Sequence, residues 1–270
     1  MTLVKLGGSL ITDKRRPGRA RRSVIARLAG EIAASAAGLS SGLIVGHGSG
    51  SFGHPEAARH GLRRGAGTGL SGRGELAGVA ETQARAAALH RLVVEALLAA
   101  GAAPFSLAPS SFMSASAGRP VGLALEPLLQ ALDGGLLPVT YGDVVLDRRQ
   151  GATICSTETV FRSLVQALRR RGRVVARALW LGATEGVYDG RGELVEEVTA
   201  ANLRRTLAAA GGAAGTDVTG GMRHRLETAA ALARVGVDSW ILDGRVPDRL
   251  TLTLAGKTVP GTHVAAAAGG

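Results

Sequence analysis

The sequence predicts an α/β protein, a three-layer α/β/α sandwich whose central sheet is largely parallel. Short apolar runs of strand type alternate along the whole chain with segments of helical periodicity, which favours parallel strands between helical layers. With 270 residues and 46% hydrophobic content, the chain can bury a large core as one domain, or as two closely joined lobes. No repeat or low-complexity linker interrupts this order.

The first half of the chain is expected to begin with a strand that contains Lys5. Ser23 has the chemistry of an N-cap for a helix that stops near Gly38. A strand at 43–45 follows, then a glycine-rich loop and a helix that Pro55 and Gly61 cut short. A long helix from about 74 to 98 carries one apolar face, with His90 at the surface beside it; the face comprises Leu89, Leu92, Val93, Ala96 and Leu97.

The second half continues the alternation. Buried strands are expected at 103–107 and 136–141, followed by a hairpin over 143–153 whose turn lies at 147–151. A strand at 174–181, helices at 199–209 and 221–235, and a strand at 239–242 complete the prediction. The segment 211–215 is expected to be a flexible loop within the domain.

Lysine is rare in this chain, because only three of its 32 basic residues are lysines. Two of them, Lys5 and Lys14, flank the segment Leu6-Gly7-Gly8-Ser9. Glycines let backbone N–H groups crowd around an anion, and a lysine ammonium is a compact charge that can follow a moving phosphoryl group. This stretch therefore predicts a phosphate site, the alternative being an ordinary turn after a strand.

A second segment has the same character. Four glycines fall within nine positions from Gly46 to His54, directly after the strand at 43–45. The run from Gly48 to Gly53 also spells the dinucleotide-binding fingerprint, but no acidic residue follows at a strand end near position 70. The segment 256–258 lacks the first glycine of a Walker A loop, because Thr251 stands there. An anion cradle at a helix start fits the segment best.

Together the two segments resemble the amino acid kinase superfamily, and the run Gly48-Ser49-Gly50-Ser51-Phe52-Gly53-His54 resembles its isopentenyl phosphate kinase branch and the related fosfomycin kinases. Further matches in the same order extend the resemblance over essentially the whole chain; they are Gly61-Leu62, Pro109-Ser110-Ser111, Pro138-Val139, Gly142-Asp143-Val144-Val145, Gly186-Val187-Tyr188-Asp189 and Asp217-Val218-Thr219-Gly220-Gly221-Met222. The resemblance implies the amino acid kinase fold, with an acceptor-binding N-terminal lobe at about 1–150 and a nucleotide-binding C-terminal lobe at about 151–270.

The resemblance also implies roles for particular residues. Lys14 would stabilise the transition state, and Asp143 would orient Lys5 or Lys14. Ser49 and His54 would hold the acceptor's phosphate, with Thr157 beside them. The residues implied in ATP binding are Lys5, Leu6, Gly7, Gly8, Ser9, Gly50, Ala183, Gly221 and Arg225. Mg²⁺ would arrive with ATP, held mainly by phosphate and water oxygens and by no protein metal cage.

Three departures from the family pattern fall in the nucleotide half. Ser156-Thr157-Glu158 stands where relatives carry serine-glycine-aspartate, Ala183 stands where they carry an aspartate, and Arg225 stands where they carry a lysine. Thr157 adds bulk beside the acceptor site, and Ala183 removes a carboxylate from base or ribose recognition. The motifs that cradle phosphates are better preserved than those that recognise the donor.

Composition narrows the functional classes. Aromatic residues make up 3% of the chain, too few for stacking platforms that bind single-stranded nucleic acid, although the net charge is +11. A single cysteine, Cys155, excludes an internal disulfide and is expected in the core. No apolar run would span a membrane and no leader precedes the first strand, so a cytoplasmic protein with small-molecule substrates is expected. The resemblance adds a homodimer.

Three functions remain open at this stage. The leading hypothesis is ATP-dependent phosphorylation of isopentenyl phosphate to its diphosphate in isoprenoid biosynthesis. A fosfomycin-type phosphonate kinase shares the histidine and lysine pattern. A degenerate kinase fold that binds a phosphorylated ligand is the third.

Overall fold

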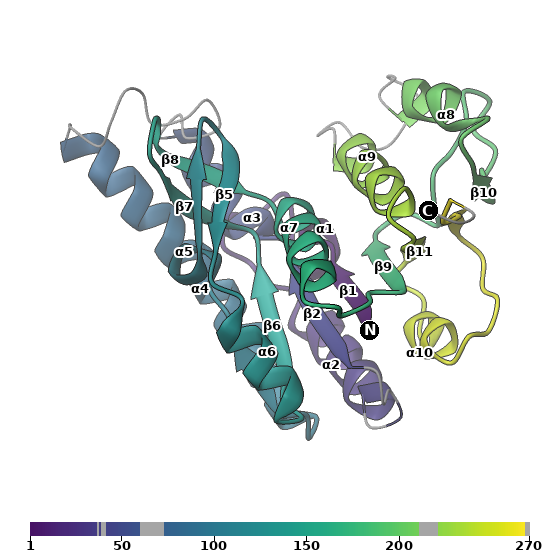
Figure 1. Cartoon of the computed structure of the whole chain (residues 1–270), viewed down its shortest axis with the longest axis horizontal. Helices are drawn as coiled ribbons and strands as arrows, with labels where there is room; N and C mark the ends of the chain where they lie inside the picture. Colours follow the sequence, from purple (N-terminus) through teal and green to yellow (C-terminus); the bar gives the residue numbers. More distant parts are fainter. Residues whose placement is uncertain (37, 39–41, 60–72, 211–220, 268–270) are drawn as a thin grey trace.

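The structure is a computed structural model that describes residues 1–36, 38, 42–59, 73–210 and 221–267 (Figure 1). A large sheet has the strand order β10-β12-β11-β9-β1-β2-β6-β3, and every neighbouring pair is parallel except β11–β12. Its strands are β1 (Thr2–Leu6), β2 (Leu43–His47), β3 (Pro104–Ser106), β6 (Leu137–Tyr141), β9 (Arg177–Gly182), β10 (Glu197–Val198), β11 (Asp238–Asp243) and β12 (Thr262–Val264). The predicted largely parallel sheet is confirmed.

A second, four-stranded sheet has the strand order β5-β4-β7-β8. It comprises β4 (Met113–Ser116), β5 (Arg119–Leu123), β7 (Asp143–Asp147) and β8 (Gly151–Cys155). The predicted hairpin is its β7–β8 pair, in which Asp143 faces Cys155 and Asp147 faces Gly151. The strands β4 and β5 were not expected from the sequence.

Helices cover both faces of the large sheet. One face packs on α2 (Arg22–Ala36), α4 (Arg73–Ala99) and α10 (Arg249–Leu254), and the other on α6 (Glu126–Asp133), α7 (Thr157–Arg170) and α9 (Gly221–Ala233). Shorter or peripheral helices are α1 (Gly8–Ile11), α3 (Gly50–Arg59), α5 (Pro109–Phe112) and α8 (Leu203–Ala210). Successive side chains of β1 point to opposite faces of the sheet: Leu3 packs in the core under α7, and Val4 packs in the core under α2.

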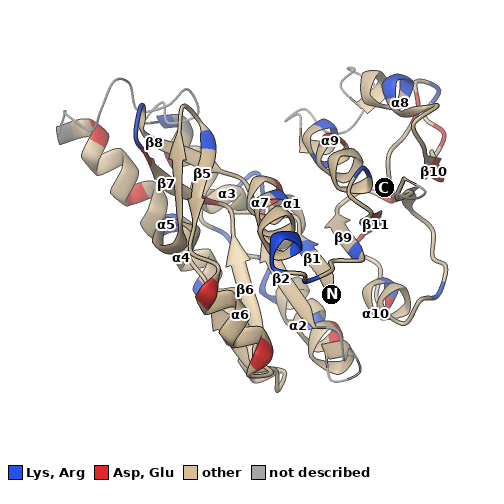
Figure 2. Ribbon diagram, viewed as in Figure 1, with Lys and Arg blue, Asp and Glu red and all other residues tan. Residues whose placement is uncertain are grey.

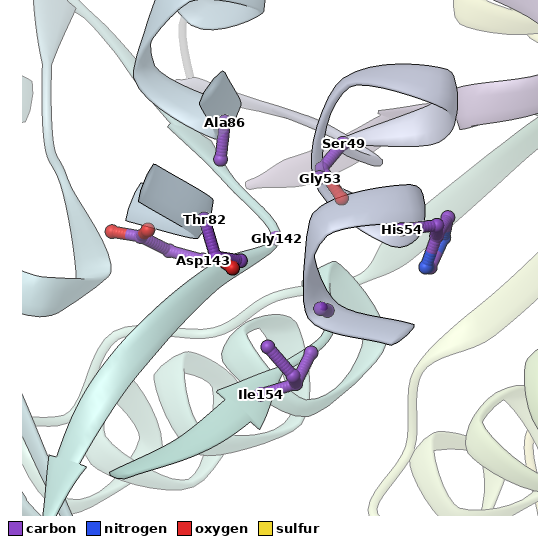
Figure 3. Close-up of a pocket in the computed structure, with 9 residues that line it drawn as sticks. Ser49, Gly53, His54, Thr82, Ala86, Gly142, Asp143 and Ile154 are labelled. Atoms are coloured by element: carbon purple, nitrogen blue, oxygen red, sulfur yellow. The ribbon is translucent and has the colours of Figure 1, made fainter. Parts of the chain in front are cut away.

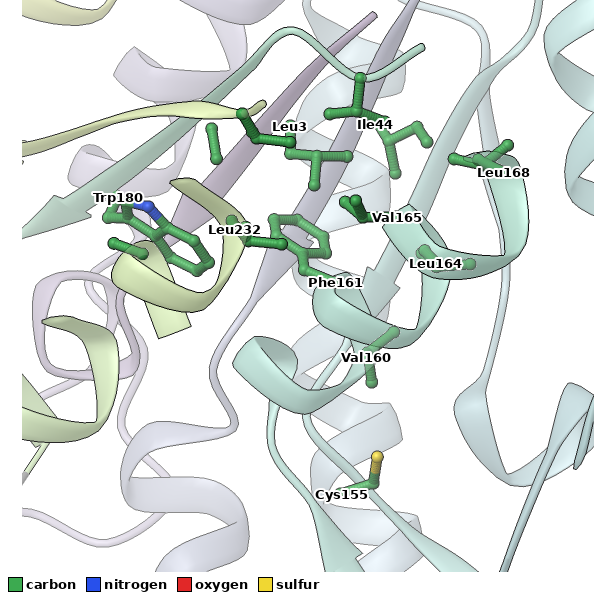
Figure 4. Packing of buried hydrophobic residues seen from close by; sticks show 14 of the residues in the cluster. Leu3, Ile44, Cys155, Val160, Phe161, Leu164, Val165, Leu168, Trp180 and Leu232 are labelled. Carbon is green, nitrogen blue, oxygen red and sulfur yellow. The ribbon is translucent and has the colours of Figure 1, made fainter. Parts of the chain in front are cut away.

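The core on the α7 side is built around Phe161 and Trp180, whose rings lie 5.9 Å apart between the helix and the sheet (Figure 4). Cys155 lies at the end of this cluster and is 2% exposed, which confirms the predicted core thiol. Burial raises its pKa to about 12, so the thiol stays protonated at physiological pH.

Several local predictions were wrong. Helix α2 begins at Arg22, so Ser23 lies inside its first turn and is not the N-cap. Strand β3 is partly exposed because it forms the edge of the sheet. Helix α8 begins at Leu203, four residues later than expected, and α7 was missed altogether. The segment 211–215 lies outside the described residues.

Pro55 does not cut α3 short, since the helix continues to Arg59. A proline inside a helix removes one N–H, so the carbonyl four residues earlier loses its donor. Here that carbonyl belongs to Ser51, and it accepts a hydrogen bond from the Gly18 N–H at 2.9 Å. A contact from a distant loop therefore replaces the bond that proline removes.

None of the described helices combines the length and the apolar character that a membrane span requires. Basic residues are spread over both halves of the chain, as Figure 2 shows.

Candidate active site

The predicted site residues meet at one edge of the large sheet. Parallel pairing places Leu6 opposite both His47 and Leu181, so β1, β2 and β9 end at the same level. The loops that follow these strands begin at Gly7, Gly48 and Ala183. Ligands of open α/β sheets bind outside the carboxyl ends of the strands, and these loops occupy that position.

The two glycine segments pack directly against each other. A Cβ on Gly8 would lie 2.6 Å from the Gly50 nitrogen, and one on Gly48 would lie 2.9 Å from the Gly8 nitrogen. Gly50 also has a φ of +50°, a conformation that side chains disfavour. Thr12 joins the segments, since its hydroxyl donates to the Gly8 carbonyl at 2.6 Å and accepts from the Ser51 N–H at 3.0 Å. The two predicted anion cradles are therefore one structure.

This junction presents backbone donors. Within the part of the chain that the structure describes, the N–H groups of Gly8, Ser9, Ser49 and Gly50 have no hydrogen-bond acceptor. Gly50 opens the ten-residue helix α3, whose N-terminal N–H groups and dipole favour an anion. Polar N–H groups beside a cationic cluster are suited to phosphate oxygens.

Lys5 lies below the cradle on the α7 face of the sheet, because it alternates with Val4 and Leu6 along β1. It is 6% exposed and forms a buried ion pair with Glu158 in the first turn of α7. Burial lowers the pKa of Lys5 and Arg225 lowers it further, against the opposing effect of Glu158. Burial alone would raise the pKa of Glu158, but Lys5 and Arg225 bring it down to about 2.

Arg225 completes this charged cluster, defined here as Lys5, Glu158 and Arg225. It is 8% exposed and enters from α9. A Cβ on Gly182 would lie 2.8 Å from its Nη1, and one on Gly7 would lie 3.6 Å from its Nη2. The guanidinium thus lies beneath the ends of β1 and β9, and the cluster of two cations and one anion carries a net charge of +1.

Lys14 lies in an exposed turn that leads out of α1. The turn closes through the Asp13 N–H, which donates to the Arg19 carbonyl at 2.9 Å. The Gly18 N–H then binds the turn to Ser51 in the first turn of α3. The cradle is therefore flanked by two lysines in different environments: Lys5 is buried in an ion pair, and Lys14 is exposed.

A small pocket opens beside α3, and Ser49, His54 and Asp143 all line it (Figure 3). Gly53 must be small there, since a Cβ would lie 2.7 Å from the Ser49 hydroxyl oxygen. The imidazole of His54 is exposed and projects from the side of α3 that faces away from Asp143. The predicted acceptor residues are therefore neighbours.

Asp143 is held by contacts other than the expected one to Lys5, whose buried partner is Glu158. Its carboxylate accepts from the Ser110 N–H at 3.1 Å and from the Val144 N–H at 2.9 Å. Burial raises its pKa despite these hydrogen bonds. An effect of Asp143 on Lys14 stays a prediction.

Thr157 is 1% exposed, and its hydroxyl donates to the His47 carbonyl at 2.7 Å. Its methyl group fills the space beside Gly46, where a Cβ would lie 2.7 Å from it. The extra bulk at this position therefore packs into the protein, and its hydroxyl is already bonded to the backbone.

His90 is buried, which corrects the prediction that it lies at the surface. It is 5% exposed and lies with Thr82 and Ala86 on a stripe of α4 next to the predicted apolar face. Helix α4 is covered by α3 as well as by the sheet, so it buries a wider arc than its apolar residues indicate. The ring of His90 stacks on Tyr141 with a centroid distance of 4.3 Å.

Residues 1–243 match the sequence profile described as the amino acid kinase family. The chain is a member of the amino acid kinase family.

Relatives of this amino acid kinase carry a more specific name. It is 32% identical to the isopentenyl phosphate kinase of Methanothermobacter thermautotrophicus and 32% identical to that of Haloferax volcanii, with 98% of each chain covered in both cases. A solved structure titled as isopentenyl phosphate kinase superposes with a TM-score of 0.80 at 29% identity, covering 98% of this chain and 99% of that one. The predicted fold is confirmed by this likeness.

The departures from the family pattern fall among residues that the sequence predicts to bind the donor. Ala183 follows β9 and is half-buried, and the nearby Glu185 pairs with Arg249 at 2.9 Å. Asp243 ends the neighbouring strand β11 opposite Gly182 and holds Arg245 at 2.7 Å. Gly221 opens α9, while the motif residues 217–220 and 61–62 lie outside the described residues.

Sequence reasoning missed three polar residues of this region, namely Glu158, His47 and His90. Glu158 was noticed only as a departure from a motif, although a lysine buried in a strand requires an acid from a covering element. His47 precedes the second glycine segment and was taken only as part of that motif. The helical spacing of Thr82, Ala86 and His90 was the available signal for a second buried stripe.

Proposed function

We propose that this amino acid kinase transfers the γ-phosphoryl group of ATP to isopentenyl phosphate, giving isopentenyl diphosphate and ADP. An oxygen of the acceptor phosphate attacks the γ-phosphorus, and the bond to the β–γ bridging oxygen breaks. The observation that carries the proposal is the single cradle formed by the two glycine segments, whose N–H groups have no acceptor among the described residues and lie above the buried cations Lys5 and Arg225. The full-length similarity to isopentenyl phosphate kinases supports this acceptor.

The residues divide between the two substrates. Lys5 through Ser9, Gly50 and Arg225 would bind the donor phosphates, while Ser49 and His54 would bind the acceptor phosphate. Lys14 would stabilise charge on the transferred group, since phosphoryl transfer depends on positioning and electrostatics more than on covalent chemistry of the protein. The lobes near 1–150 and 151–270 would serve the acceptor and the nucleotide respectively.

Mg²⁺ would come with ATP and neutralise charge on its phosphates. Among the described residues there is no group of three or more histidine, cysteine, aspartate or glutamate side chains able to hold a metal ion. The cradle offers N–H groups and cations, which bind phosphate oxygens and not a metal. These residues fit an ion carried by the nucleotide. A cytoplasmic location and a homodimer complete the proposal.

The test is an assay of ADP release with isopentenyl phosphate, dimethylallyl phosphate and fosfomycin side by side. We expect turnover with isopentenyl phosphate to exceed that with fosfomycin at equal concentration. Preference for fosfomycin would favour the phosphonate kinase, and no turnover with any acceptor would favour a phosphorylated-ligand binding protein.

The acceptor assignment rests on His54. We expect His54→Ala to raise the KM for isopentenyl phosphate about ten- to a hundredfold and to leave the KM for ATP nearly unchanged, because a charge-assisted hydrogen bond to phosphate contributes about 1.5–3 kcal/mol. His54→Gln keeps a neutral donor and should fall between the two. Loss of ATP affinity with acceptor affinity intact would move His54 to the donor side.

A further inference from the structure

A chain of polar groups runs from Ser106 at the exposed edge of the sheet, through the buried side chains of His90 and His47, to the acceptor loop. His47 ends β2, His90 comes from α4 and Ser106 ends β3. The Ser106 hydroxyl oxygen lies 2.6 Å from His90 Nε2, and His90 Nδ1 lies 3.0 Å from His47 Nε2. His47 Nδ1 lies 3.2 Å from the Gly48 carbonyl oxygen. We call these three side chains the histidine chain.

The Gly48 carbonyl, at the end of this series of hydrogen bonds, determines which nitrogen of each imidazole carries the proton. A carbonyl oxygen only accepts, so His47 Nδ1 must carry the proton that is donated to Gly48. Burial keeps the imidazole of His47 neutral, so its Nε2 accepts and His90 Nδ1 donates. His90 is neutral for the same reason, so its Nε2 accepts from the Ser106 hydroxyl. All three bonds therefore point the same way, toward the loop.

The consequence concerns the peptide between Gly48 and Ser49. In a trans peptide the C=O and the following N–H point in opposite directions. A Gly48 carbonyl held against His47 therefore turns the Ser49 N–H away from it. In the described part of the chain this N–H has no acceptor. Glycine restrains its own peptide weakly, so the orientation needs an outside contact.

The backbone of His47 is itself anchored. Its carbonyl accepts from the Thr157 hydroxyl at 2.7 Å and from the Gly142 N–H at 2.9 Å. Its ring lies 5.6 Å from that of Tyr141, nearly parallel to it. The position of the His47 ring is therefore fixed by these contacts, and what remains to be set is its tautomer, which depends on the hydrogen bond from His90.

We propose that the histidine chain is a positioning device for phosphoryl transfer: His90 selects the tautomer of His47, which holds the Gly48–Ser49 peptide with the Ser49 N–H directed to the acceptor's phosphate. His47 and His90 are positioning residues that contact no substrate. The identity of that phosphate as isopentenyl phosphate rests on the proposed function.

His90 could act through the stacking of its ring or through the hydrogen bond that it donates to His47, and two substitutions distinguish these roles. His90→Phe keeps an aromatic ring for stacking on Tyr141 and removes the donor to His47. His90→Asn keeps an N–H near the position of Nδ1 and removes the ring. His263→Phe is the matched control, since His263 also stacks on an aromatic ring, the indole of Trp240 at a centroid distance of 4.5 Å, and lies on the distant strand β12.

The first measurement needs no substrate. The chain holds six histidines, so ¹H–¹⁵N correlation spectra of the imidazole nitrogens can be assigned by substitution. We expect His47 to be protonated on Nδ1 in the parent and in His90→Asn, and to lose this single tautomer in His90→Phe. Protonation of His47 on Nε2 in the parent would overturn the inference.

The second measurement is kinetic. We expect His90→Phe to raise the KM for isopentenyl phosphate about three- to tenfold, as for the loss of one neutral hydrogen bond, with the KM for ATP within twofold. His90→Asn should restore the acceptor KM to within twofold of the parent, and His263→Phe should leave it unchanged. Equal acceptor defects in His90→Phe and His90→Asn, or equal changes in both KM values, would contradict positioning.

If isopentenyl phosphate is not turned over at all, the proposed function fails while this inference remains testable. The tautomer of His47 and the shift of the Ser49 amide signal on titration with inorganic phosphate then decide it. A phosphate-induced shift in the parent that is lost in His90→Phe and kept in His90→Asn would support it. A shift of equal size in all three proteins would overturn it.

Discussion

Two polar clusters, one with buried charges and one with buried imidazoles, lie under the same loops, on opposite faces of neighbouring strands. The charged cluster lies below β1 on the α7 and α9 side, and the histidine chain lies below β2 on the α4 side. The first contains three formal charges, while the second is held neutral by burial, which lowers the pKa of His47 to about 3 and that of His90 to about 4.

The difference follows from what each cluster faces. The charged cluster brings two cations, Lys5 and Arg225, to the ends of the strands where a phosphate group would bind. The histidine chain is complete within the protein, since each donor has its acceptor and the last acceptor is the loop itself. One cluster supplies charge and the other supplies orientation.

The largest expected effect breaks the charged cluster. We expect Glu158→Gln to lower the free energy of unfolding by about 3–5 kcal/mol, because the buried ammonium of Lys5 then loses its ion-pair partner. Chemical denaturation at pH 7 measures this. Glu227→Gln is the control, since Glu227 forms an exposed pair with Arg223 at 2.9 Å and should cost under about 1 kcal/mol. Similar losses in both variants would mean that Lys5 and Arg225 are already solvated.

A second prediction compares the two lysines. Lys14→Ala should lower kcat about a hundredfold or more with both KM values little changed, because an exposed ammonium can meet charge that develops only in the transition state. Steady-state kinetics of ADP release measures this. Equal turnover in variant and parent would remove Lys14 from the mechanism and leave the fixed charge of the buried cluster to act alone.

The contributions of the two clusters to the stability of the protein should be lost over different pH ranges. The pKa values of His47 and His90 lie below the ordinary 6.5, so the unfolded state binds more protons and stability falls as the pH drops from about 6.5 toward 4, by up to roughly 1.4 kcal/mol per pH unit for each group. Glu158, with a pKa of about 2 against 4.5, contributes stability that is lost only below about pH 4.5.

Denaturation at a series of pH values tests this separation. His90→Phe should flatten the profile between pH 6.5 and 4, and Glu158→Gln should flatten it below 4.5. A parent whose stability is constant from pH 6.5 to 5 would show that the histidines titrate normally.

The smallest expected effect concerns the departure at Arg225. We expect Arg225→Ala to raise the KM for ATP about tenfold and Arg225→Lys to raise it less, because a phosphate oxygen accepts either cation. Unchanged ATP kinetics in the alanine variant, with reduced stability, would show that Arg225 only balances Glu158.

The sequence by itself determined the strand that carries Lys5, both glycine segments and the alternation of strands and helices that gives a largely parallel sheet. Those features depend on local chemistry: alternation in a strand, the conformational freedom of glycine and the apolar spacing of helices. The family resemblance also placed Ser49 and His54 together at the acceptor phosphate, and these two residues line one pocket with Asp143.

Tertiary structure decided which partners those residues meet. The acid beside Lys5 is Glu158 because α7 crosses the face of β1 to which Lys5 points, which no spacing in the sequence specifies. His90 is buried because α3 covers a second stripe of α4, and Pro55 is tolerated because the loop at Gly18 supplies the missing donor. Each is a contact between segments distant in sequence, and such contacts exist only once the layers have packed.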